Sequence, residues 1–180
     1  QHYYTQNGKR EGKFVLYDKD SCHVIQNYCF YQNGMLNGDF YEFFNDSAHK
    51  VRVHSFYIND TLNGPYFEYY ENGSIKLMGD YIKGKREGTW KMFYPNDSLY
   101  IMGTYVNGKK EGEWVVYYPS GKIKQKGHYK NDQEEGDWVF YHEDGYIDIK
   151  GSYTHGKDSG LWQRLDSLGN VVKEINVDNR

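Results

Sequence analysis

The chain is poor in the residues that build helices. Alanine occurs once among 180 residues, at Ala48, and there are only three prolines and two cysteines. Tyrosine and glycine each occur 20 times, alongside nine phenylalanines and four tryptophans. Because aromatic residues favour strands and strong helix formers are scarce, this composition argues against an all-helical fold and against an ordinary α/β enzyme.

Charge and hydrophobicity argue against two further classes of protein. Lys and Arg number 22 and Asp and Glu 25, a net charge of −3, so no basic field favours a nucleic-acid partner. No apolar run approaches the roughly 18 residues of a membrane helix, so no transmembrane segment is expected. The chain begins at Gln1 rather than Met, which fits a cleaved signal peptide and an expression boundary equally. An exported location, periplasmic or at the surface, is slightly favoured over a cytoplasmic one.

A repeat of 24 to 26 residues runs through the chain, and each unit is anchored by a glycine. These anchoring glycines are Gly12, Gly38, Gly64, Gly88, Gly112, Gly136 and Gly160. The first two intervals are 26 residues and the later four are 24. Regular spacing of this kind is typical of repeat proteins, so we expect residues 1–180 to form a single array.

Two positions in each unit indicate how neighbouring strands pack. The position two residues after the anchor is always aromatic: Phe14, Phe40, Tyr66, Trp90, Trp114, Trp138 and Trp162. A second glycine lies fifteen residues after the anchor in four units: Gly79, Gly103, Gly127 and Gly151. A bare glycine on a strand leaves room for a flat ring from its neighbour, so we predict that the aromatic rings lie across these glycines.

Each unit is predicted to form two short strands bounded by turns. Pairs such as Asn33-Gly34 and Asn107-Gly108 supply the positive φ angles of tight hairpin turns. The fold class expected is all-β, an elongated, twisted, single-layer antiparallel sheet of tandem hairpins. In the strand after each anchor, Trp90 and Phe93 point to opposite sides if the strand is regular. That strand therefore either bulges or carries aromatic rings on both faces.

Residues that could support catalysis or bind metal form no convincing cluster. The seven histidines occupy unrelated repeat positions, so no metal site and no cofactor is expected. Cys22 and Cys29 both fall on one predicted strand. Seven extended residues span about 23 Å, whereas a disulfide requires Cα atoms within about 7 Å, so we expect no bond between them. No catalytic residue is assigned, and the chain is predicted not to be an enzyme.

The repeat resembles the bacterial variant of the MORN (membrane occupation and recognition nexus) repeat. The resemblance rests on residues 105–114, with the sequence YVNGKKEGEW, followed by Tyr117 and Gly121. It recurs at residues 81–90 and more loosely at 129–138, and it is weakest over residues 1–60. For the fold, the resemblance implies hairpins placed side by side. For function, it implies scaffolding or lipid-linked roles, and many bacterial members are labelled antitoxin components of toxin–antitoxin systems.

The leading functional hypothesis is a non-enzymatic module that binds a protein or a cell-envelope component. The candidate binding residues lie six positions after successive anchors: Phe44, Tyr70, Tyr94, Tyr118 and His142. One alternative is binding of carbohydrate or a choline-type ligand by the aromatic rows. Another is an antitoxin-like partner of a toxin protein, which rests on the family resemblance alone. The sequence does not fix the oligomeric state.

Overall fold

The computed structural model describes residues 2–18, 24–45 and 48–179, and these residues fold as tandem antiparallel hairpins. Residues 1–87 and 88–180 form two compact units, which are described separately. The first unit holds β1 (His2–Gln6), β2 (Lys9–Tyr17), β3 (Ile25–Gln32), β4 (Met35–Phe43), β5 (Val51–Ile58), β6 (Thr61–Tyr69) and β7 (Ile75–Ile82). The strand β8 (Lys85–Phe93) crosses the boundary.

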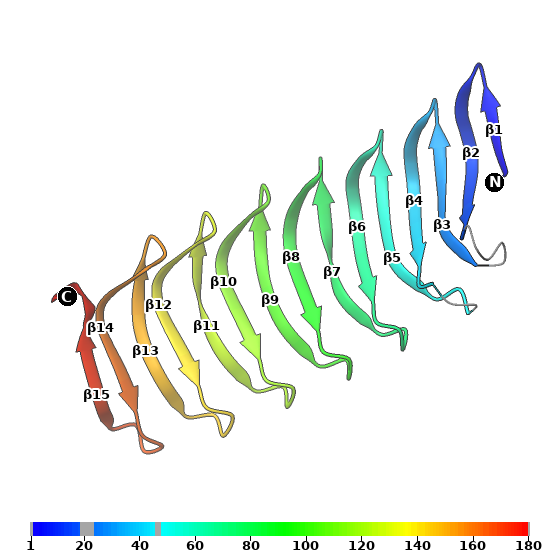
Figure 1. Cartoon of the computed structure of the whole chain (residues 1–180). Coiled ribbons are helices and arrows are strands. Elements are labelled where there is room, and N and C mark those ends of the chain that lie inside the picture. Colours follow the sequence, from blue (N-terminus) through cyan, green and yellow to red (C-terminus); the bar gives the residue numbers. More distant parts are fainter. Residues whose placement is uncertain (1, 19–23, 46–47, 180) are drawn as a thin grey trace. The chain divides into compact units, whose positions relative to one another are not determined.

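The second unit continues the same pattern (Figure 1). It contains β9 (Leu99–Val106), β10 (Lys109–Tyr117), β11 (Ile123–Lys130), β12 (Gln133–Tyr141), β13 (Ile147–Thr154), β14 (Lys157–Leu165), β15 (Val171–Asn176) and a final short 3-10 helix, η1 (Val177–Asn179). In both units the order of the strands in the sheet is their order along the chain. The predicted all-β class of tandem hairpins is therefore confirmed, while a single array over residues 1–180 stays a prediction.

The turns form where the sequence places them. Tight turns carry positive φ angles at both central residues, for example 53° at Asn107 and 84° at Gly108. At the other end of each hairpin a wider turn is closed by paired backbone bonds, as where the N–H of Tyr118 donates to Lys122 O over 2.8 Å. Figure 1 shows the two kinds of turn at opposite ends of the strands.

The register decides between the two alternatives left open by the sequence, because the bulge lies in the strand that follows each wide turn and not in the strand after the anchor. In β8 and β9, Trp90 pairs with Gly103, Met92 with Ile101 and Phe93 with Leu99. Tyr100 of β9 is therefore the extra residue, whereas β8 keeps its alternation. Trp90 and Phe93 thus point to opposite sides, and the strand carries aromatic rings on both faces. A second irregularity lies at the anchoring glycines, whose φ is positive, 69° at Gly112.

Aromatic rings lie over strand glycines, as predicted. A Cβ atom added to Gly127 would stand 2.2 Å from Cδ2 of Trp138, and one added to Gly103 would stand 2.0 Å from Cδ2 of Trp114. Tyrosine edges complete a ladder: Tyr129 meets Trp138 edge-on, with ring centroids 5.3 Å apart. The exposed fraction of Trp138 is 4%, and we call this side of each unit the ladder face.

In β3 and β5 of the first unit, other small residues take the place of the strand glycine beneath an aromatic ring. The position that holds glycine in β9, β11 and β13 is occupied by Cys29 in β3 and Ser55 in β5, with exposed fractions of 2% and 1%. Cys29 pairs with Phe40 of β4 rather than with a tryptophan. In this pair a residue larger than glycine thus lies beside a ring smaller than that of tryptophan. Cys29 is a free thiol, and Cys22 lies outside the described residues.

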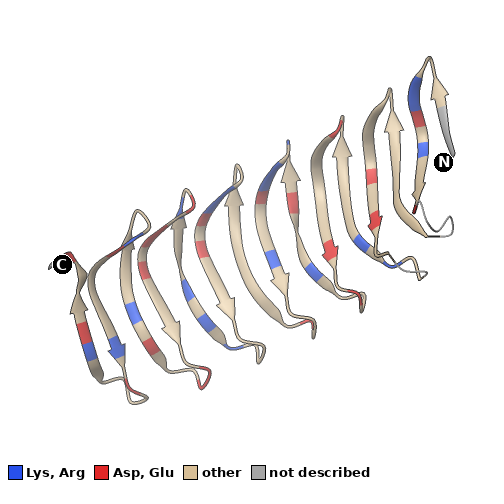
Figure 2. Cartoon of the chain, in the orientation of Figure 1, with Lys and Arg blue, Asp and Glu red and all other residues tan. Residues whose placement is uncertain are grey.

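A row of side chains holds each tight turn to the hairpin before it. The residue preceding an anchoring glycine accepts a hydrogen bond from the first N–H of the next tight turn. Asn33 donates to Glu11 Oε2 over 2.8 Å, and Asn131 donates to Glu111 Oε2 over 2.7 Å. These carboxylates account for acidic segments near the tight turns in Figure 2. Hydrogen bonds of this kind, which a carboxylate strengthens, link each tight turn to the preceding hairpin along one edge of each unit. We call them clasp bonds.

Candidate functional site

The face opposite the ladder face carries a row of aromatic rings in the first unit. Neighbouring residues alternate sides on a strand, so Tyr28 and Tyr41 lie on the face opposite the buried Cys29 and the half-buried Phe40. His54 and Phe67 continue this row on β5 and β6, and they pair directly across the strands. We call Tyr28, Tyr41, His54 and Phe67 the aromatic row. All four are half-buried, and they form a continuous apolar strip across four strands.

The centre of the aromatic row is fixed by stacking and by one charged group. The rings of Tyr41 and His54 lie face to face, with centroids 4.3 Å apart and planes at 10°. Nε2 of His54 lies 2.8 Å from Oδ1 of Asp39, which holds the ring orientation. Burial, and then the charge of Asp39, raise the pKa of Tyr41, so its phenol stays uncharged. The arrangement is therefore rigid and suited to packing against another surface.

The repeat pattern does not reveal the aromatic row, because its members belong to two different repeat positions. Tyr41 and Phe67 lie three residues after an anchor, whereas Tyr28 and His54 lie on the alternate strands. Only the strand register brings the two positions side by side. The signal available in the sequence was the aromatic identity of residues 41 and 67, which lie 26 residues apart.

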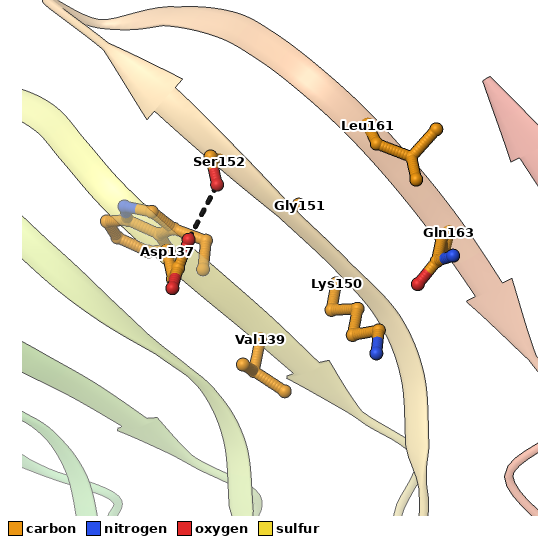
Figure 3. A pocket seen from close by; sticks show the side chains of 8 residues that line it. Asp137, Val139, Lys150, Gly151, Ser152, Leu161 and Gln163 are labelled. Atoms are coloured by element: carbon orange, nitrogen blue, oxygen red, sulfur yellow. Dashed lines mark hydrogen bonds between the residues drawn. The ribbon is translucent and has the colours of Figure 1, made fainter. Parts of the chain in front are cut away.

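The second unit has a different chemistry at the same position. Val139 of β12 pairs with Lys126 and Lys150 of the flanking strands, so apolar and cationic side chains alternate. Figure 3 shows Val139, Lys150 and Gln163 beside a shallow cavity of about 220 Å³. At its margin Ser152 donates a hydrogen bond to Asp137 over 2.6 Å. The aromatic row is thus a property of residues 1–87.

The five residues predicted to bind a partner lie at the wide turns, each directly after an even-numbered strand. Their backbone N–H groups close these turns, with donor–acceptor distances of 2.8 to 2.9 Å. Phe44 lines a cavity of about 450 Å³ together with Glu42 and Arg52. His142 is half-exposed and stacks on Tyr146 at 4.8 Å. The structure brings these residues to one edge of each unit, and their role in binding stays a prediction.

Two of these tyrosines connect neighbouring hairpins. The hydroxyl of Tyr94 donates to Tyr117 O over 2.9 Å, and that of Tyr118 donates to Tyr141 O over 2.8 Å. Each bond reaches from one wide turn to the strand end of the next hairpin. At the last wide turn Asp166 takes the same position, and hydrogen bonds from Asn170 hold the pKa of its carboxyl below the usual value. The wide-turn position therefore has a structural role in the second unit.

Replacing Tyr118 with Phe is expected to lower the free energy of unfolding by about 0.5–1.5 kcal/mol, because one interhairpin hydrogen bond is lost. Chemical denaturation measures the change. Tyr146→Phe is the control, since the Tyr146 hydroxyl makes no hydrogen bond within the described part of the chain. Equal losses in the two variants would contradict a specific role for the Tyr118 hydroxyl.

Two common kinds of site are missing from the described residues. Among residues 2–18, 24–45 and 48–179, no group of three or more His, Cys, Asp or Glu side chains could hold a metal ion. Over the same ranges, no helix is both long and apolar enough to cross a membrane.

Comparison with known families agrees with the repeat. Three consecutive segments, residues 62–83, 86–107 and 110–131, match the MORN repeat variant. They begin 24 residues apart, as the spacing of the anchoring glycines requires. No curated protein matches the chain. The middle of this chain is thus similar to MORN-variant repeats, and the same hairpin continues on both sides of the matched segments.

Proposed function

We propose that this protein is a non-enzymatic scaffold that binds a protein partner through the aromatic row of its first unit. The observation that carries the proposal is the aromatic strip of Tyr28, Tyr41, His54 and Phe67, on a face that no other element covers among residues 2–18, 24–45 and 48–87. Contiguous exposed apolar patches mark interaction sites in soluble proteins. The similarity to MORN-variant repeats supports a binding module, since such repeats act as binding modules.

The rigidity of the hairpins also supports a scaffold. Clasp bonds at the tight turns fix each hairpin to the one before it, for example Lys83 N–H to Asn63 Oδ1 over 3.1 Å. A surface that is ordered before binding loses less conformational entropy when a partner docks. The aromatic row is therefore presented as a preformed surface.

Site-specific photo-crosslinking in the producing cell tests this function. A photoreactive phenylalanine analogue at Phe30 or Phe67 is expected to give discrete protein adducts. Phe30 is 37% exposed, and its ring meets Tyr28 edge-on at 5.4 Å, so it lies beside the row. The matched control is the same analogue at Lys150, which is exposed at the equivalent position of β13.

Adducts at Phe30 and Phe67, but not at Lys150, would support the proposal. Adducts at Lys150 alone would place the binding surface in the second unit and contradict the proposal. The absence of an adduct at all three sites would also contradict the proposal. Mass spectrometry of the adduct identifies the partner.

The other predicted functions have weaker support. A sugar or a quaternary amine needs a free ring face, but Tyr41 and His54 cover one another, as do His142 and Tyr146. An antitoxin role and a bacterial origin stay predictions from the family resemblance. A cell-envelope component as partner also stays a prediction, and the crosslinking experiment covers it where the component is a protein.

A further inference from the structure

We propose that the partner of the aromatic row is a second copy of this chain, packed face to face about a two-fold axis that runs parallel to the strands between β4 and β5. The inference rests on the proposed function, since it names the protein that the row binds. It follows from the pattern of side chains on the face of β2 to β7 opposite the ladder face.

A two-fold axis in this position places β2 of one copy over β7 of the other, β3 over β6 and β4 over β5. An interface of this kind is isologous, so the surface must be complementary to itself. The strand register continues the aromatic row to Val15 on β2 and Met78 on β7. The facing pairs are then Val15 with Met78, Tyr28 with Phe67, and Tyr41 with His54. Apolar side chains therefore meet apolar or aromatic ones at every strand.

The next position along the strands carries the charges. There the outermost strands carry opposite charges, with Lys13 on β2 and Asp80 on β7, and both side chains are exposed. The two-fold axis sets Lys13 of each copy against Asp80 of the other. Between them Phe30 on β3 faces Pro65 on β6. At the centre Asp39 on β4, which is bound to His54 of its own copy, faces Phe56 on β5. The face thus combines a largely aromatic centre, in which the carboxylate of Asp39 is bound to His54, with opposite charges on its outermost strands.

The area of this face is large enough for a stable dimer. Strands of eight residues, as in β3, β5 and β7, and six strands at about 4.8 Å spacing give a face of roughly 29 by 26 Å, or about 760 Å². A standard protein interface buries about 800 Å² on each partner. Two sheets also pack well through such faces, because side chains of the inner faces interdigitate.

The contact of Lys13 with Tyr28 places its charge at the margin of the proposed interface. Its ammonium group lies 4.5 Å from the centre of the Tyr28 ring, which places the cation directly beside the row. Like charges brought together at an interface oppose association, whereas opposite charges favour the correct pairing. Charge reversal at the two ends of the face therefore tests the geometry without removing any ring.

Sedimentation equilibrium over a concentration series measures self-association of the full chain. The wild-type chain is expected to reach twice its mass of 21.3 kDa. K13D alone and D80K alone are each expected to raise the dimer dissociation constant about tenfold or more, because two like-charge contacts form. An equimolar mixture of K13D and D80K restores both opposite-charge contacts, and we expect its dissociation constant within about threefold of wild type. K130D, at an exposed lysine of β11, is the control.

Each outcome either supports or overturns the proposed two-fold dimer. Rescue by mixing supports the two-fold arrangement, because neither variant alone can form the contacts. A wild-type chain that stays monomeric overturns the inference, and so does a dimer that is insensitive to K13D and D80K. Failure of this inference is distinguishable from failure of the proposed function. Crosslinking from Phe67 to a different protein would keep the binding role and exclude the second copy, whereas the absence of any adduct would contradict both.

Discussion

Replacing Gly127 with Ala is expected to destabilise the protein by about 1–3 kcal/mol, and replacing Trp138 with Ala by about 3–5 kcal/mol. The first change puts a methyl group 2.2 Å from a carbon of the Trp138 ring, so the ring must leave its position. Gly127 is not in a positive-φ conformation, which makes this steric conflict the source of the loss. The second change removes a ring that is only 4% exposed. Urea denaturation of each variant gives the free energies.

The double variant separates this contact from general damage to the strand. Once Trp138 is alanine, the added methyl group at Gly127 has space, so the two losses should not add. We expect the double variant to be more stable than the sum of the single losses implies, with a coupling energy of roughly 1 kcal/mol or more. His128→Ala is the control on the same strand, because His128 is exposed and lies on the other face. Strict additivity would show that the ring does not depend on the glycine.

Two substitutions together should give the first unit the glycine–tryptophan packing found in the second unit. Cys29→Gly alone is expected to cost about 1–3 kcal/mol, because it leaves a cavity and adds a flexible residue to a strand. Phe40→Trp alone is expected to cost a similar amount, about 1–3 kcal/mol, because the larger ring meets the Cys29 side chain. The two changes together recreate the glycine–tryptophan pair of β9 and β10.

Thermal and urea unfolding of the double variant give the decisive comparison. We expect its stability to exceed that of either single variant. The control combination is Cys29→Gly with Tyr28→Phe, which alters the neighbouring residue on the other face and fills no space at the ladder face. Recovery in the control, or no recovery in the Cys29→Gly, Phe40→Trp variant, would contradict the matching of ring and strand residue.

The sequence predicts hairpins and ring–glycine packing well because each depends on residues close together in the chain. Asn-Gly pairs determine local φ angles, so Asn33-Gly34 and Asn107-Gly108 identify turns without knowledge of the partner strand. Gly103 and Trp114 lie in strands joined by a single tight turn, so the contact of the ring with the glycine follows once that turn is placed.

The bulge and the aromatic row depend on register, which the sequence pattern does not contain. The pairing shifts where one extra residue, Tyr100 of β9, lies between the partners of Met92 and Phe93. Tyr41 and His54 are 13 residues apart and become neighbours only through the pairing of β4 with β5. The predicted residues at the wide turns share one repeat position and lie at one edge of each unit, and their role in binding stays a prediction. Their hydrogen bonds to the next hairpin depend on side-chain direction, which periodicity does not specify.

The location of each ring over its glycine determines where hairpins can be gained, lost or exchanged in such a repeat protein. Trp114 and the glycine it covers, Gly103, belong to one pair of strands joined by one tight turn, as do Trp138 and Gly127. A segment that runs from one wide turn to the next therefore carries both halves of its own steric match. Duplication, deletion or recombination at the wide turns would preserve that match. A crossover within a tight turn between hairpins of different type, such as β3 with β10, would set the ring of Trp114 against Cys29. The wide turns are thus the places where the number of hairpins can vary at the lowest cost in stability.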